Sequence, residues 1–181
     1  PTMIRVFESG GDIHAETLHN VLHSADLNQR RLAKNVNFGL VYGIESQGLQ
    51  AYLANSDPPT IVSLAQAAMI RSNFFCNYPY LMTWIEEAEE RALTNGFTET
   101  LMHRRRYFPE LQFATGYEKA DILKSAVNHE DQGTAADIMK CAMVELGHLP
   151  LLLQIHDELL LEIPESSIMS IAEEVSSTMR A

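Results

Sequence analysis

Cysteine is scarce in this sequence, which holds only Cys76 and Cys141 among its 181 residues. Two cysteines are too few for the disulfide framework of a small secreted domain, so we expect a reducing compartment. No apolar run approaches the roughly 20 residues that cross a bilayer, and the first residues do not resemble a targeting signal. These absences argue against a disulfide scaffold and a membrane-spanning chain, and we expect a cytoplasmic protein.

Basic residues are also few. Thirteen lysines and arginines stand against 24 aspartates and glutamates, which gives a formal net charge of −11. A chain that coats DNA without sequence preference would carry the opposite charge. The cations are instead gathered locally, within residues 30–34 and again within residues 104–106. With 46% hydrophobic residues, the chain can build one substantial core, and two subdomains are possible.

The sequence has no internal repeat and no low-complexity segment, so its elements are predicted from apolar spacing and turn residues. The pattern predicts helices over about residues 12–23, 28–42, 46–54, 60–76, 79–95, 117–128 and 133–146, and a last helix from Glu165. Residues 97–108 and 151–163 predict two hairpins. The predicted fold class is α+β, mostly helical, with a small antiparallel sheet.

The segment Gln154–Ile163, QIHDELLLEI, places three ionisable residues between two apolar runs. The runs are short, rich in Leu and Ile, and bounded by prolines, which predicts the strands of a hairpin. We expect His156, Asp157 and Glu158 at its bend, where buried charge costs several kcal/mol unless a metal, a partner or water takes it up. An open turn is the alternative, but such turns favour Gly, Asn or Ser beside Asp, and none is present.

A second candidate site lies in RRLAKNVNFGLVYG, residues 30–43, which contain no proline and predict a helix. At about 100° per residue, four residues spaced four apart share one side of that helix: Arg30, Lys34, Phe38 and Tyr42. Its leucines fall on the opposite side. Two cations followed by two flat rings suit a ligand with phosphates at one end and a base at the other. The alternative is an amphipathic helix whose rings reach a second core.

Lys124, Asn128 and Gln132 are also spaced four apart, which places a cation and two amides on one side if the helix is continuous there. Amides offer both a donor and an acceptor, as contacts to the minor groove require. The alternative is that the amides only cap the boundary between two helices.

These segments, in order along the chain, resemble the polymerase domain of family A DNA polymerases, the DNA polymerase I group. They are DIHAET at 12–17, RRLAKNVNFGLVYG at 30–43, RRRYFPEL at 104–111, NHEDQGTAADIMK at 128–140 and QIHDELLLE at 154–162. The resemblance spans nearly the whole chain. It implies a fragment of a longer polymerase, with about residues 1–115 mainly fingers and about 116–181 the end of the fingers and part of the palm.

The resemblance implies that the complete enzyme adds dNTPs to a primer 3′ end, using two Mg²⁺ ions held by palm carboxylates. Asp157 matches a metal-binding catalytic carboxylate, and Glu158 matches an auxiliary acid beside it. The residues that match triphosphate-binding groups are His14, Arg30 and Lys34, and those that match rings beside the sugar and base pair are Phe38 and Tyr42. The residues that match contacts to primer–template DNA are Arg104, Arg105, Arg106, Lys124, Asn128, Gln132 and His156. The resemblance also implies the cytoplasm of a prokaryotic cell or of a phage-infected host.

The chain departs from the family pattern at several places. Lys124 stands where the family usually has Arg, which keeps the charge but loses the bidentate fork. HEDQ at 129–132 replaces an apolar approach to the Gln. No segment like DYSQIELR, which carries the family's other metal-binding aspartate, occurs here, so we expect these 181 residues alone to be inactive. A hairpin without its neighbouring strand is expected to self-associate through its exposed edge.

Two other functions are compatible with parts of the sequence. A metal-dependent phosphohydrolase could use His156, Asp157 and Glu158, but it would need further ligands at close spacing. A noncatalytic nucleic-acid-binding module would instead be expected to carry a basic net charge and no carboxylate at the bend.

Overall fold

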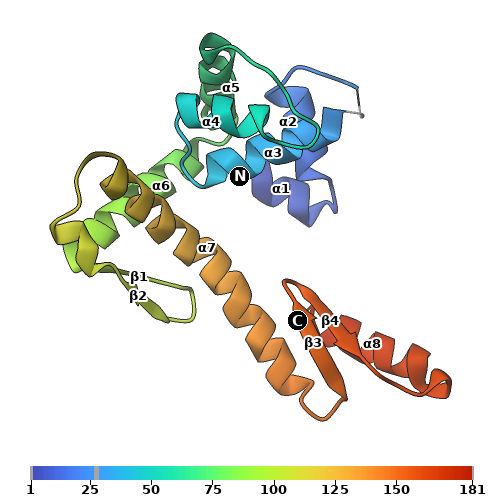
Figure 1. Ribbon diagram of the computed structural model, residues 1–181. Coiled ribbons are helices and arrows are strands. Elements are labelled where there is room, and N and C mark those ends of the chain that lie inside the picture. The colour runs from blue at the N-terminus through green and yellow to red at the C-terminus, as the bar shows by residue number, and fades with distance from the viewer. Residues whose placement is uncertain (1, 27–28, 181) are drawn as a thin grey trace. The chain divides into compact units, whose positions relative to one another are not determined.

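The structure, a computed structural model, describes residues 2–26 and 29–180 (Figure 1). The chain divides into two units. The first comprises the residues up to Phe97 together with Phe108–Val127, and the second comprises Thr98–Tyr107 and the residues from Asn128 onward. The predicted start of one helix, Asn28, lies outside the described residues.

The first unit is helical. Its elements are α1 (Thr2–Glu8), α2 (Ile13–Asn20), α3 (Arg30–Val41), α4 (Ser46–Ala54), α5 (Leu64–Asn77), α6 (Pro79–Asn95), the 3₁₀ helix η2 (Pro109–Gln112) and the first part of α7 (Gly116–Glu145). The predicted helices α2 to α6 are confirmed with small shifts at their ends. Helix α1 has no counterpart among the predictions, because its seven residues carry too little pattern to identify a helix.

Local sequence signals account for where these helices begin and end. The Asp12 carboxylate accepts a hydrogen bond from the backbone N–H of His14 at the start of α2. Ser63 and Gln66 form a reciprocal capping box at the start of α5. Helix α6 begins at Pro79, and Gly96 ends it with a φ of 73°, a left-handed conformation that glycine adopts without strain.

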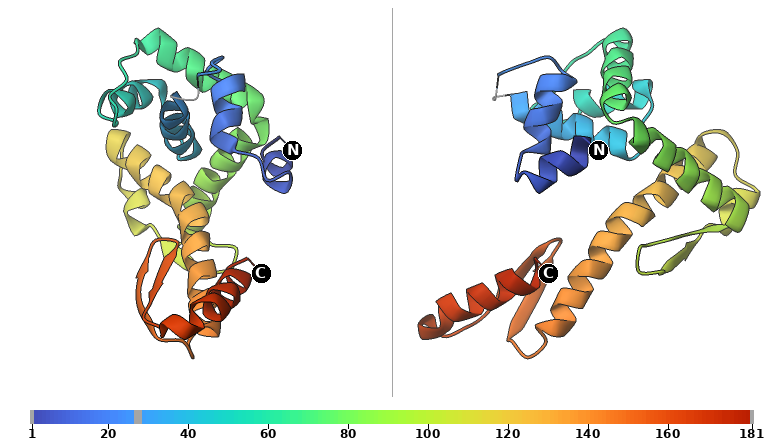
Figure 2. Two further views of the ribbon diagram at one scale, coloured as in Figure 1. Left: turned by 90° about the vertical axis from the view of Figure 1, so that its right-hand side faces the viewer. Right: turned by 180° about the vertical axis from the view of Figure 1, so that it is seen from behind.

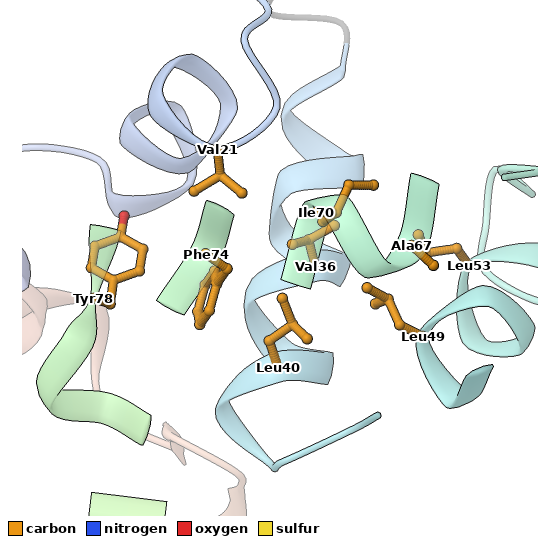
Figure 3. Close-up of a cluster of buried hydrophobic side chains, with 9 residues drawn as sticks. All are labelled: Val21, Val36, Leu40, Leu49, Leu53, Ala67, Ile70, Phe74 and Tyr78. Atoms are coloured by element: carbon orange, nitrogen blue, oxygen red, sulfur yellow. The ribbon is translucent and has the colours of Figure 1, made fainter. Parts of the chain in front are cut away.

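The main core of the first unit lies where α3 packs between α2, α4 and α5 (Figure 3). Val36 and Leu40 of α3 are fully buried against Leu49 of α4 and Phe74 of α5. The ring of Phe74 also meets the ring of Tyr78 edge to face, with 5.0 Å between centroids. Burying side chains of this size contributes about 1.5–3 kcal/mol each, so this cluster fixes how α3 is held.

Two smaller clusters join α6 to the first part of α7. Ile85 and Ala88 of α6 pack on Val127, and Ala92 packs with Phe108 and Ala126. Small residues on facing helices let the two backbones come close, so the contact is narrow and well defined.

In the second unit, strands β1 (Phe97–Glu99) and β2 (Arg105–Tyr107) form a hairpin whose loop packs on α7 through polar contacts. The Thr98 hydroxyl lies 2.9 Å from Nδ1 of the buried His129, and the backbone N–H of Leu101 donates to the Thr134 hydroxyl at 3.0 Å. The Arg104 guanidinium donates to the Asp137 carboxylate at 2.7 Å. The predicted hairpin over residues 97–108 is thereby confirmed.

Helix α7 corrects the prediction of two helices with a break near residues 129–132. It runs without interruption from Gly116 to Glu145, although Gly133 lies in its interior. A glycine costs a helix about 1 kcal/mol relative to alanine, which one interior position can tolerate. A Cβ at Gly133 would lie 2.9 Å from Cγ2 of Thr100 and 3.0 Å from Cδ2 of His129. The glycine therefore allows the hairpin loop to approach α7 rather than ending the helix.

Strands β3 (Leu151–Ile155) and β4 (Glu158–Leu161) form the second hairpin, pairing antiparallel with Ile155 opposite Glu158. The predicted hairpin is confirmed, but the turn contains only two residues, His156 and Asp157, and Glu158 is the first residue of β4. His156 has a φ of 54°, so it takes a left-handed turn position that Gly and Asn adopt more readily.

A 3₁₀ turn, η3 (Glu165–Ser167), leads into α8 (Ile168–Thr178), so the last helix begins slightly later than predicted. Helix α8 lies beside the β3–β4 hairpin, as Figure 1 and the right-hand view of Figure 2 show. An open groove of about 560 Å³ runs between β4 and α8, with mostly apolar walls that include Leu159, Leu161, Ile171 and Val175. Across the described ranges, no helix is long and apolar enough to span a membrane.

The tight approach at Gly133 generates a prediction about stability. Gly133→Ala should destabilise the chain by on the order of 1 kcal/mol, because overpacking costs about 1–3 kcal/mol and outweighs the gain in helix propensity of about 1 kcal/mol. Urea unfolding measures the difference. Gly39→Ala is the matched control, since a Cβ there would make only ordinary contacts at 3.5 Å and beyond. A Gly133→Ala chain as stable as Gly39→Ala would contradict the steric explanation.

Candidate active site

Helix α3 presents one exposed stripe and buries the opposite face, as the spacing predicted. Arg30, Lys34 and Phe38 are exposed, with 42% of the Phe38 surface accessible. Val36 and Leu40 on the other side are fully buried. Tyr42 follows the last residue of the helix and is half-buried. The structure therefore brings the cations and the first ring of the stripe to one surface of the first unit.

Helix α2 adds two side chains to this surface. The Arg30 Nε donates to the Asp12 carboxylate at 2.5 Å, which ties the start of α3 to the start of α2. The His14 ring lies 6.1 Å from the Phe38 ring, and the Lys34 Nζ lies 5.6 Å from the same ring centroid. His14, Lys34 and Phe38 thus form one group around the phenyl ring, with Arg30 one turn away.

Behind this surface, a line of hydrogen bonds leads into the core. Asn37 is buried, and its amide nitrogen lies 2.8 Å from Nδ1 of His14. The Thr17 hydroxyl donates to the amide oxygen of Asn37 at 2.8 Å and lies 3.1 Å from the hydroxyl of Tyr78. This line was not predicted. Asn37 lies at roughly 340° around α3 when Arg30 is set at 0°, between the exposed stripe and the buried face, and that position is the signal that could have found it.

The positive charges of Arg30 and Lys34 favour binding of an anion at this surface, and the His14 imidazole is kept neutral. Burial lowers the pKa of His14 below its ordinary value, and Arg30 and Lys34 lower it further, whereas Asp12 opposes them. The hydrogen bond from Arg30 lowers the pKa of Asp12 from 3.8 to about 2. Asp12 is therefore ionised at neutral pH, and besides capping α2 it offsets part of the charge of Arg30.

The ionisable residues of the second hairpin lie in the second unit. His156, Asp157 and Glu158 are all exposed, and the Gln154 side-chain amide donates to the carbonyl of His156. Carboxylate oxygens are the ligands that Mg²⁺ prefers, so Asp157 and Glu158 fit that ion in kind. Within residues 2–26 and 29–180, however, no three His, Cys, Asp or Glu side chains gather as a complete metal site.

The arginine cluster is partly engaged inside the second unit. Arg104 donates to Asp137 and, at 3.0 Å, to the carbonyl of Gly133. Arg105 donates to Glu99 at 2.6 Å, and this bond lowers the pKa of Glu99. Arg106 is exposed and close enough to His129 to contribute, after burial and Arg104, to lowering the pKa of that histidine. The three guanidinium groups are therefore not equivalent.

The cation and amides of α7 lie on one continuous helix, as the spacing required. Lys124 pairs with Asp121 at 3.1 Å, Asn128 is half-buried and Gln132 is exposed. Because α7 does not break near residue 130, the alternative in which the amides cap a helix boundary is wrong. Helix geometry alone places the three residues at successive turns of α7.

Comparisons with known proteins identify the family of this chain. The family model of DNA polymerase family A matches residues 1–181. The thermostable DNA polymerase I of Thermus caldophilus is 38% identical over 97% of this chain and 21% of the relative's length. DNA polymerase I of Deinococcus radiodurans is 39% identical over 91% of this chain and 18% of its own length. The chain belongs to DNA polymerase family A, and it spans about a fifth of the length of these relatives.

A solved structure is also similar. It is the POL domain of Pol1 from M. smegmatis in complex with DNA primer-template and dNTP, which matches with a TM-score of 0.84 and 28% sequence identity. The match covers 97% of this chain and 32% of that chain. The mostly helical α+β fold is thereby that of part of a polymerase domain.

The Asp12–Arg30 pair generates a prediction about pH. Because the pKa of Asp12 is lowered in the folded chain, its contribution to stability is present above about pH 3.8 and is lost as the pH falls through about 2. Asp12→Asn should keep the helix cap and remove this acid-dependent loss. Urea unfolding at several values between about pH 4 and pH 2 measures it. With Asp57→Asn at an exposed carboxylate as control, an unchanged acid slope in Asp12→Asn would count against the pair.

Proposed function

We propose that this chain is the part of a DNA-directed DNA polymerase that binds the incoming dNTP and supplies one of the metal-binding carboxylates. The observation that carries the proposal is the group formed by His14, Lys34 and Phe38, with Arg30 one turn away. It combines two cations, a neutral imidazole and an exposed ring on one surface. We assign residues 1–115 mainly to the fingers, and residues 116–181 to the end of the fingers and part of the palm.

The chemistry of the surface matches the two ends of a nucleotide. Arg30 and Lys34 supply positive charge for a triphosphate, and charge-assisted hydrogen bonds are about twice as strong as neutral ones. The Phe38 ring offers a flat apolar surface of the kind that packs on a sugar, and Tyr42 extends the stripe by one turn toward the base. The order of cations and rings along α3 thus sets the direction in which the nucleotide lies.

Primer–template DNA is the second proposed partner. Asn128 and Gln132 are side-chain amides that suit the shared acceptors of the minor groove, and Lys124 adds a charge for a phosphate. Arg106 and the turn residue His156 are exposed and are proposed for the same role. Arg104 and Arg105 would act partly through the order they give the β1–β2 hairpin. The similar solved structure was determined with primer-template DNA and dNTP, which supports both partners.

The proposed reaction is nucleotidyl transfer to a primer 3′ hydroxyl, in DNA replication or repair, in the cytoplasm of a prokaryotic cell or of a phage-infected host. Asp157, with Glu158 beside it, would hold Mg²⁺. Of the two ions in the complete enzyme, one would lower the pKa of the attacking hydroxyl and the other would neutralise the leaving pyrophosphate. Family membership favours this function over the metal-dependent phosphohydrolase and the noncatalytic binding module.

The proposed nucleotide site predicts a specific loss of binding. Lys34→Ala should weaken dATP binding to the chain by about tenfold to a hundredfold, since a hydrogen bond to a charged group contributes about 1.5–3 kcal/mol. Calorimetry or fluorescence titration measures the affinity. Lys119→Ala removes a half-buried lysine of α7, elsewhere in the first unit, and should have no effect. Equal affinities in the two variants would overturn the proposed site.

The metal chemistry predicts that these 181 residues do not extend primers by themselves. Two ions at the spacing required for in-line transfer need more carboxylates than Asp157 and Glu158 provide. A primer-extension assay with the purified chain, Mg²⁺ and all four dNTPs tests this, with a complete DNA polymerase I as the positive control. Template-dependent extension that Asp157→Asn abolishes would show that the chain is sufficient for catalysis.

The exposed leucines of the β3–β4 hairpin predict self-association of the chain. Leu152, Leu153 and Leu160 are each more than half exposed, and an uncovered apolar strand is a template for association. We expect dimers or larger species in sedimentation at tens of micromolar, where such surfaces associate. Leu153→Lys should reduce association, whereas Met69→Lys, at an equally exposed apolar residue of α5, should not. A monodisperse wild-type monomer would contradict the prediction.

A further inference from the structure

The hydrogen bonds behind the nucleotide surface form a single line with a definite direction. It begins at the Tyr78 hydroxyl, passes through Thr17 and Asn37, and ends at Nδ1 of His14. Tyr78, Thr17 and Asn37 are buried, and His14 is half-buried at the surface. The line therefore connects the core of the first unit to a side chain of the proposed site.

The direction follows from counting donors along the line. A hydroxyl has one proton, so Thr17, which donates to the Asn37 oxygen, must accept from Tyr78. The Asn37 oxygen is occupied by Thr17, so its amide nitrogen faces His14 and donates to Nδ1. Nδ1 is then an acceptor, and a neutral imidazole with an acceptor at Nδ1 carries its proton on Nε2.

The opposite direction is disfavoured by the buried end of the line. If His14 donated to Asn37 and Asn37 donated to Thr17, one buried hydroxyl proton would lack an acceptor. It would be the Tyr78 proton if Thr17 donated to Tyr78, or the Thr17 proton if Thr17 accepted from both, since among the described residues the Thr17 hydroxyl bonds only to Asn37 and Tyr78. Tyr78 is 95% buried, at 5% exposure, and across the described residues its hydroxyl has no hydrogen-bond partner other than Thr17. A buried donor without a partner loses its hydrogen bond to water and gains none in the protein, which selects the first direction.

We propose that Asn37 is a positioning residue that, together with Thr17 and Tyr78, holds His14 as the Nε2–H tautomer, so that His14 donates a hydrogen bond from Nε2 to a phosphate oxygen of the nucleotide. This inference rests on the proposed function, since it concerns the same site. In this arrangement His14 is a neutral donor of fixed orientation, and the positive charge comes from Arg30 and Lys34. Burial of His14 and the charges of Arg30 and Lys34 lower the pKa of His14, whereas the charge of Asp12 raises it.

Protonation of His14 would disturb the line rather than strengthen it. A second proton would sit on Nδ1, opposite the Asn37 amide nitrogen, which has no lone pair to accept it. The Asn37 amide would have to turn, and Thr17 would then lose its acceptor. The line therefore couples the tautomer of the half-buried His14 ring to the packing of Tyr78 in the core.

The tautomer can be measured on the chain itself by long-range ¹H–¹⁵N correlation of the histidine rings, with His14→Gln to assign the signal. We expect wild type at pH 8 to show His14 as the Nε2–H form. Asn37→Asp replaces the donor by a carboxylate that only accepts, and it should move the proton to Nδ1 and raise the pKa of His14. Asn35→Asp adds the same charge on the same helix without a bond to His14 and should leave the tautomer unchanged. Wild type in the Nδ1–H form, or Asn37→Asp without effect, would overturn the inference.

A second measurement links the tautomer to binding. Tyr78→Phe removes only the first hydroxyl of the line and leaves the charge of the site unchanged. We expect a mixture of His14 tautomers and a loss of dATP affinity of about threefold to tenfold, the range for one neutral hydrogen bond. If Tyr78→Phe binds dATP like wild type while Lys34→Ala does not, the positioning role is wrong and the nucleotide site stands. If wild type binds no dATP, the proposed site fails, and donation to a phosphate fails with it.

Discussion

The proposed nucleotide site depends on one constraint: helix α3 must bury one face completely while leaving the opposite stripe free. Val36 and Leu40 are fully buried against α4 and α5, so α3 cannot rotate about its axis without exposing them. Arg30, Lys34 and Phe38 are on the same rigid helix and are therefore held in a fixed order at the surface. A rotation by one residue, about 100°, would bring the cations toward the core, where an unpaired charge costs several kcal/mol.

The second unit depends on a polar contact rather than an apolar one. Thr98, Leu101 and Arg104 of the β1–β2 hairpin bond to His129, Thr134 and Asp137 of α7, and Gly133 leaves the space that the hairpin loop occupies. Hydrogen bonds are directional, so this contact fixes the register of the hairpin along α7 more narrowly than apolar packing would. Among the described residues, Nε2 of His129 and one oxygen of Asp137 are buried without a hydrogen-bond partner, and the other bonds of the contact outweigh that cost.

Most of the fold could be predicted because its signals are local. Asp12, Ser63, Pro79 and Gly96 mark helix ends through their own side chains or backbone freedom, and the stripe of α3 follows from spacing alone. The continuity of α7 could not be predicted in this way. In the sequence, Gly133 indicates a helix end. The close approach of the β1–β2 hairpin, about 30 residues earlier in the chain, explains why a glycine lies inside α7 instead.

The residues of the candidate site also differ in whether a local sequence pattern could identify them. The cations and ring of α3 were identified from their pattern, and the residues that hold His14 were not, because Thr17, Asn37 and Tyr78 come from α2, α3 and the junction of α5 with α6. No sequence period links them. Their common property is burial of a polar group, and a buried polar group requires a partner. The partner of Asn37 is His14. The requirement to satisfy polar groups in the core therefore reaches the surface and fixes the tautomer of the half-buried His14 ring.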